Sequence, residues 1–208
     1  PGFIEPALMV ETGDAPSGMG SHWNARIRSQ VDLSDPKGLE PLAASTRTSM
    51  RQAGYAVAAA HPSQGILRGR GMVIPMAENA VDVRPYHAVI PMSAGFDRGG
   101  WGAGGYPNSL MGAIALMRQS ILDARWHEAC LDNWQRDPGK MQRPPRRDAL
   151  AAMKDVVNRR QPLLVETGSL NNAARADAIA DEFELDLWLV GTGEEYQNIT
   201  AIKQLDCP

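Results

Sequence analysis

Short apolar segments alternate along this chain with amphipathic segments long enough to form helices. The clearest unit runs from an apolar strand at 162–166, through a helix capped by Asn171, to a second apolar strand at 187–190. The apolar positions of that helix follow the i, i+3, i+4, i+7 pattern: Ala176, Ile179, Ala180 and Phe183. Strands that are apolar on both faces and alternate with helices predict a parallel sheet with right-handed crossovers. We therefore expect an α/β protein, either a barrel or a doubly wound sheet.

The rest of the chain supplies further elements of the same two kinds. Strands are expected at 3–10, 55–60, 71–76 and 86–92. Helices are expected from near Leu39 to a cap glycine at Gly54, and at 109–135, 148–159 and 194–205. Glycine- and proline-rich segments at 13–20, 95–105 and 137–147 predict connecting loops.

The bulk properties exclude several classes of protein. The chain has 208 residues, 43% of them apolar, which is enough to bury the core of one domain. Its formal net charge of −3 is spread over mixed segments, so no basic face is expected that would bind nucleic acid. The apolar stretches are too short to cross a membrane. Cys130 and Cys207 have no paired or metal-ligand spacing, so the compartment stays open.

The opening segment Pro1-Gly2-Phe3-Ile4-Glu5-Pro6 resembles the first barrel strand of the amidohydrolase superfamily. In that superfamily the pattern is Pro-Gly-apolar-Ile-Asp, followed within a few residues by His-x-His. Segments 22–26 and 105–112 are similar to imidazolonepropionase-related amidohydrolases. The resemblance implies an α/β fold of the TIM-type (β/α) barrel kind. Residues 1–208 would form a single segment of it, about strands one to six, truncated at both ends.

The family's His-x-His places two imidazoles on one side of a strand, where both reach a divalent metal that activates water. The resemblance puts Ala7 and Met9 at these positions, and neither is a suitable ligand for a hard metal. It aligns the strand-five and strand-six histidines with Glu166 and Gly191. No strand-four lysine or glutamate could be placed. The metal motifs are therefore degenerate, and no metal is expected in this segment, although a longer protein could hold one such as zinc elsewhere.

By resemblance the chain implies a metal-dependent hydrolase of cyclic amides or other C–N bonds, in which this segment is non-catalytic or structural. Its expected partners are the rest of the barrel, a second barrel domain or further copies of the chain. One alternative is an active hydrolase with an unusual mononuclear site that uses Glu166 and His61. Another is a nucleotide-binding domain, because Gly100–Gly105 matches G-x-G-x-x-G between a strand and a helix.

Five residues are the candidates for functional roles. Glu166 and His61 are catalytic candidates, because each stands at the end of an expected strand, where barrel enzymes gather their active-site residues. Asp97, Arg98 and Asn108 are substrate-binding candidates in and after the glycine-rich loop. A simpler interpretation of His61 is a loop histidine, and a simpler interpretation of Asp97 and Arg98 is an exposed charge pair.

Overall fold

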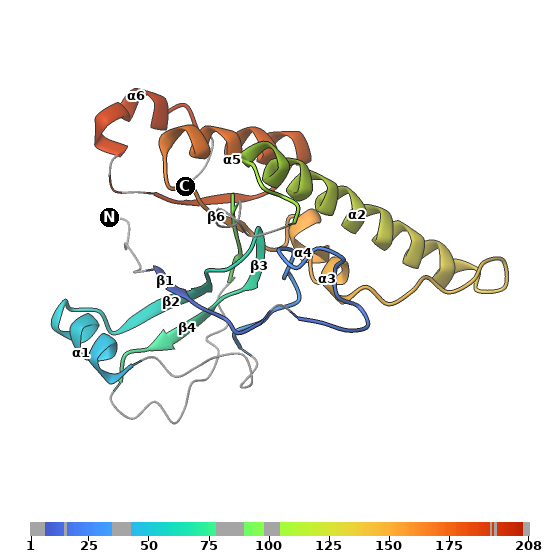
Figure 1. The fold of residues 1–208 in the computed structure, drawn as a ribbon, viewed down its shortest axis with the longest axis horizontal. Helices are drawn as coiled ribbons and strands as arrows, with labels where there is room; N and C mark the ends of the chain where they lie inside the picture. Colours follow the sequence, from blue (N-terminus) through green and yellow to red (C-terminus); the bar gives the residue numbers. More distant parts are fainter. Residues whose placement is uncertain are drawn as a thin grey trace.

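Two open β-sheets form the centre of the molecule, and the long helices α2 and α5 lie together on one side of them (Figure 1). The computed structural model describes residues 7–14, 16–34, 43–77, 90–97, 105–191, 193 and 195–205. The first sheet has the order β1-β2-β4, from β1 (Ala7–Val10), β2 (Val57–Pro62) and β4 (Met72–Pro75). The second has the order β3-β5-β6-β7, from β3 (Leu67–Arg70), β5 (Met92–Gly95), β6 (Leu163–Glu166) and β7 (Leu187–Val190).

Helices separate β1 from β2, β5 from β6 and β6 from β7, whereas no described helix lies between β2 and β5. The described helices are α1 (Ala44–Gln52), α2 (Leu110–Arg136), α3 (Asp148–Ala151), α4 (Lys154–Val157), α5 (Leu170–Phe183), the 3-10 helix η1 (Glu195–Asn198) and α6 (Ile199–Ile202). Helices α2 to α4 connect β5 to β6, and α5 connects β6 to β7. No helix that the structure describes combines the length and the apolar character needed to span a bilayer.

The strongest periodic predictions are confirmed. The helix expected at 109–135 is α2, and the Ser109 hydroxyl caps it by accepting a hydrogen bond of 3.1 Å from the Gly112 N–H. The strands expected at 162–166 and 187–190 are β6 and β7. Gly54 ends α1 as predicted, at φ +93°, and donates to the Arg51 carbonyl while Tyr55 donates to the Met50 carbonyl. This pair of bonds is a Schellman motif, which a glycine at this position favours.

Several boundaries are wrong. Ser169 caps α5 through its hydroxyl, so the prediction of Asn171 as the cap is incorrect by two residues. The single helix expected at 148–159 is two four-residue helices, α3 and α4, and the helix expected at 194–205 is only η1 and α6. β2 begins two residues later than expected and includes His61. Most of the strand expected at 86–92, and the start of the helix expected near Leu39, lie outside the described residues.

The expectation of parallel strands throughout is also wrong. β1 and β2 are parallel, as are β5, β6 and β7, but β4 runs antiparallel to β2 and β3 runs antiparallel to β5. Connection length explains the direction of β4. A parallel connection needs a dozen or more residues, whereas residues 63–71 connect β2 to β4 and also contain β3. The described strands form a mixed α/β arrangement of two open sheets and do not close into a barrel.

Each sheet has its own apolar core. The larger core packs one face of α2 and of α5 against β5, β6 and β7, with Leu116, Met117, Ile121, Val165, Ile179 and Phe183 among its buried members. The smaller core gathers Leu33, Ala58, Ala60, Met72, Ile74 and Met76 around the first sheet. Burial of these side chains is the main favourable contribution to folding.

A segment at 26–33, which contains a turn closed by the Val31 N–H and the Arg28 carbonyl, lies beside β3. The Arg28 N–H donates to the Leu67 carbonyl at 2.6 Å, and the Arg70 N–H donates to the Val31 carbonyl at 2.8 Å. Gly69 sits between these bonds at φ +106°, and a Cβ there would lie 2.8 Å from the Val31 Cβ and even closer to its carbonyl oxygen. Only glycine allows this approach of the two segments.

We predict that Gly69→Ala lowers the free energy of unfolding by about 3 kcal/mol or more, because the new methyl group meets backbone as well as an unfavourable φ. Gly54→Ala is the matched control, since Gly54 also has positive φ but has open space around it. It should cost only about 1–2 kcal/mol. Urea unfolding of both variants measures the difference, and equal losses would contradict the close approach.

Candidate functional site

The carboxyl ends of the parallel strands bring together polar side chains from distant parts of the sequence. Gln64 and Gly65 follow β2, Asp97 follows β5, and the segment after β1 supplies residues 23–28. These residues border an open cavity of about 500 Å³, lined by Trp23, Asn24, Ala25, Arg26, Arg28, Gln64, Gly65, Asp97 and Tyr106. α/β proteins place ligands at this edge of the sheet, so this is the candidate site.

One wall of the cavity is built by Asn24 and its neighbours. The Asn24 side chain accepts a hydrogen bond of 3.0 Å from the Arg26 N–H and donates one of 2.7 Å to the Tyr106 carbonyl. The Trp23 and Tyr106 rings stack with centroids 6.4 Å apart and 18° between their planes. Arg26 forms an ion pair with Asp97, 2.8 Å from Nη1 to Oδ2. The wall therefore joins the chain after β1 to the chain after β5.

Arg28 fixes the floor of the cavity. Its guanidinium donates to the Gln64 side-chain oxygen at 2.6 Å and to the Gly13 carbonyl at 2.6 Å. Burial lowers the pKa of Arg28, and the negative charge of Asp14 opposes that effect. An arginine remains protonated even so, and its bonds hold the ends of β1 and β2 together.

Glu166, the catalytic candidate at the end of β6, forms an ion pair with Arg68. Its Oε2 lies 2.6 Å from Nη1 of Arg68, whose side chain is only 7% exposed, compared with 42% for Glu166. Arg68 Nε donates to the Gly65 carbonyl at 3.0 Å. The guanidinium crosses Gly95, where the Arg68 Cζ would be only 2.8 Å from an added Cβ. Glycine at 95 thus leaves the space that the ion pair requires.

His61, the other catalytic candidate, lies inside β2 opposite Met9 of β1 and is 3% exposed. Its Nδ1 has no hydrogen-bond partner among the described residues, and an added Cβ at Gly71 would lie 2.5 Å from that nitrogen. Burial lowers the pKa of His61 to about 4. The ring is therefore neutral near pH 7. In the described part of the chain no hydrogen bond or ion pair joins it to Glu166.

The remaining candidates are dispersed. Asp97 lines the cavity and pairs with Arg26. Asn108 is exposed, directly before the cap of α2, and is absent from the cavity lining. Arg98 and most of the Gly100–Gly105 loop lie outside the described residues, so the nucleotide-binding alternative stays a prediction.

The number of parallel strands before Glu166 differs from the expectation. In chain order the described parallel strands are β1, β2, β5, β6 and β7, because the segment expected as a strand at 71–76 is the antiparallel β4. Glu166 therefore ends the fourth parallel strand, and Gly191 follows the fifth.

The residues at these positions do not fit a metal. Ala7 offers no donor, Met9 offers a soft thioether, and Gly191 has no side chain. The carboxylate of Glu166 is held by Arg68. Throughout the described ranges, no three His, Cys, Asp or Glu side chains come together in a group that could bind a metal ion.

Comparison with known proteins gives one line of support for the fold. No protein-family model matches the chain, and no curated protein sequence matches it. The structure is similar to the crystal structure of an amidohydrolase from Thermotoga maritima MSB8, with a TM-score of 0.66 and 14% sequence identity. The match covers 100% of this chain and 55% of that one, so this chain spans about half the length of that protein. The fold resembles part of an amidohydrolase.

Sequence reasoning missed the arginines of the site. Arg68 is the partner of Glu166, and Arg26 and Arg28 border the cavity, yet none was a candidate. The one available signal was local. Arg68-Gly69-Arg70-Gly71 places charges beside glycines directly before an apolar strand, a pattern typical of close backbone approach.

We predict that stability falls as the pH decreases from about 6.5 to 4, because the unfolded chain binds a proton at His61 that the folded chain excludes. The folded pKa lies below the unfolded one, so this stability is complete above the unfolded pKa and is lost as the pH falls. His61→Met should remove up to about 3 kcal/mol of the change. Urea unfolding between pH 4 and 7 measures it.

Burial also lowers the pKa of His22 and of His127, so they contribute in the same direction. His127→Met is the matched control and should leave most of the slope in place. An unchanged pH dependence in His61→Met would show that the pKa of His61 is the same in the folded and the unfolded chain.

Proposed function

We propose that this chain is a segment of an amidohydrolase-like barrel that does not itself perform metal-dependent hydrolysis and that serves a structural role in a larger hydrolase. The observation that carries this proposal is the Arg68–Glu166 ion pair of 2.6 Å. A metal and a guanidinium compete for the same carboxylate oxygens, and here the guanidinium is covalently part of the protein and nearly fully buried.

The cost of separating this pair favours the structural role. Arg68 has little exposure, so it would be left as an unpaired buried charge if Glu166 turned to a metal ion. A metal could repay that cost only through several further ligands. Ala7, Met9 and Gly191 provide none.

Open sheet edges support a role within a larger assembly. β1 is one of the two outer strands of its sheet, β7 is one of the two outer strands of the other sheet, and each pairs with one neighbour in the described structure. Unpaired strand edges favour association with further strands. The similar amidohydrolase is nearly twice as long as this chain. We propose the rest of the barrel as the partner, with a second barrel or another copy as alternatives, and hydrolysis of cyclic amides or other C–N bonds as an activity of the remainder.

We predict that the purified chain holds no stoichiometric zinc after dialysis against zinc and removal of the excess, as measured by inductively coupled plasma mass spectrometry. Glu166→Gln should leave this result unchanged. Stoichiometric zinc in the wild-type chain that is lost in Glu166→Gln would support the mononuclear hydrolase and overturn the proposal.

A double-mutant cycle tests the ion pair directly. For Arg68→Met and Glu166→Gln we expect a coupling energy of about 1–3 kcal/mol in urea unfolding, because one partner is buried. The exposed pair Arg118–Glu182 is the matched control, and its cycle should give less than about 1 kcal/mol. Equal coupling in the two cycles would contradict the role of Arg68 as the fixed cation of the site.

We predict that the chain alone self-associates through the edge of β7, where Trp188 is 36% exposed. Trp188→Lys should shift the molecule toward monomer in analytical ultracentrifugation, since a charge on an edge strand opposes pairing. Trp126→Lys changes a 59% exposed tryptophan on α2 and should have no effect. Dissociation by the control variant alone would place the contact on α2.

A further inference from the structure

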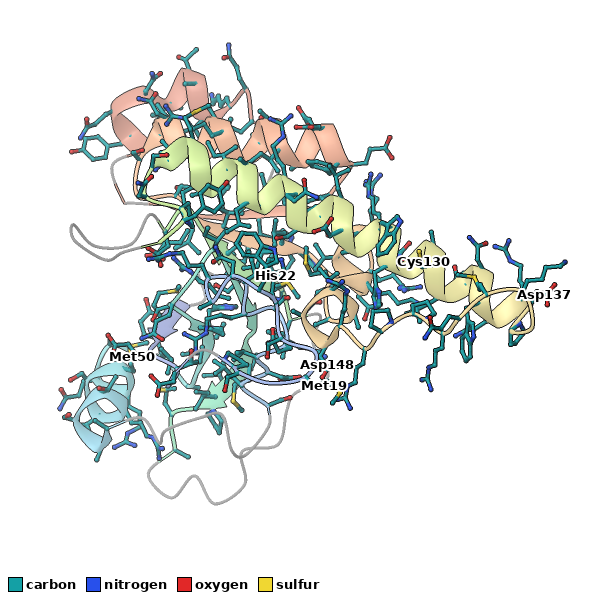
Figure 2. All side chains as sticks on the ribbon, turned by 45° about the vertical axis from the view of Figure 1, so that its right-hand side comes forward. Met19, His22, Met50, Cys130, Asp137 and Asp148 are labelled. Carbon is teal, nitrogen blue, oxygen red and sulfur yellow. The ribbon has the colours of Figure 1, made fainter. Side chains whose placement is uncertain are left out.

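The segment after α2 is the most basic part of the chain. Residues 136–147 carry five basic side chains, Arg136, Lys140, Arg143, Arg146 and Arg147, and one acidic side chain, Asp137. The whole chain has a net charge of −3, so this positive charge is local. From the tip near Asp137 the segment runs back alongside α2 to α3 and Asp148 (Figures 1 and 2).

A cavity of about 570 Å³ lies between this segment and α2. Leu131, Pro144, Pro145 and Ala151 form apolar walls, and His127, Arg143, Arg146, Arg147 and Asp148 supply the polar ones. The cavity is separate from the one at the strand ends, because the two have no lining residue in common.

Within the described part of the chain, one of the three cavity arginines is paired with a carboxylate. Arg146 pairs with Asp148, 2.6 Å from Nε to Oδ1. The described residues provide no carboxylate partner for Arg143 or Arg147. The Arg143 guanidinium lies 5.2 Å from the centroid of the Trp134 ring. Such stacking orients the group and leaves its in-plane N–H donors available.

His127 is the other titratable side chain that lines this cavity beside the arginines and Asp148. It is 3% exposed, and its Nδ1 has no hydrogen-bond partner in the described structure. Burial lowers the pKa of His127, and the positive charge of Arg147 lowers it further. The cavity therefore combines two unbalanced guanidinium groups with a neutral buried imidazole.

We propose that this cavity binds a small organic phosphate, with Arg143 and Arg147 holding the phosphate group and the walls formed by Leu131, Pro144 and Pro145 holding its organic part. Planar guanidinium forks match phosphate oxygens in pairs, and two of them balance a dianion. A monocarboxylate would neutralise only one. The apolar walls favour an organic ester over a bare ion, since they cannot hydrogen-bond to it.

The test uses isothermal titration calorimetry of the purified chain with phenyl phosphate, inorganic phosphate and benzoate as separate probes. We expect saturable binding of phenyl phosphate, weaker binding of inorganic phosphate and the weakest binding of benzoate. Arg147→Gln and Arg143→Gln should each weaken phenyl phosphate binding roughly ten-fold or more, the effect of losing a charge-assisted hydrogen bond. Both side chains are exposed, so these variants are expected to fold.

Arg175→Gln is the matched control. It removes the same charge from the exposed surface of α5, where Arg175 donates to the Asn172 side chain, and it should leave binding unchanged. Absence of saturable binding would overturn the proposal. So would equal weakening by all three variants, which would indicate general attraction of anions, or equal affinity for inorganic and phenyl phosphate, which would remove the role of the apolar walls.

Discussion

The ion pair between Arg68 and Glu166 determines much of the surrounding structure. Arg68 belongs to β3 and Glu166 to β6, so the pair crosses β5, which lies between them in the sheet. A guanidinium that is nearly fully buried must be balanced, and the carboxylate and the Gly65 carbonyl do this together. Because the guanidinium passes over β5, position 95 must lack a side chain. The charge of Arg68 thus links β3 to β6, fixes the position of the Gly65 carbonyl and requires glycine at position 95 of β5.

The same principle extends over the carboxyl edge of the strands. Arg26 is paired with Asp97, and Arg28 is bound by Gln64 and by the carbonyls after β1. These groups join segments that are far apart in the sequence. These polar groups stabilise one another, and their bonds hold the ends of the strands in place.

Periodicity and capping patterns predicted the parts of the fold that depend on local sequence. α2, α5, β6 and β7 follow directly from them, because a long apolar stripe or a short apolar run between helices leaves few alternatives. Strand direction was not predictable in this way, since an apolar run such as 71–76 has the same composition in either direction. The contacts of the candidate site were less predictable than the strand directions. Glu166 stood out by its place at a strand end, but its partner lies 98 residues earlier in the chain.

The direction of β4 also changes the strand number at which Glu166 falls. When 71–76 is counted as a barrel strand, Glu166 falls at a histidine position and looks like a replaced ligand. Because β4 is antiparallel to β2, Glu166 ends the fourth of the described parallel strands in chain order. Its carboxylate is paired with Arg68, which belongs to β3, the strand directly before β4 in the chain. The short segment between β2 and β5 that departs from the parallel pattern therefore also brings the charge that stabilises Glu166.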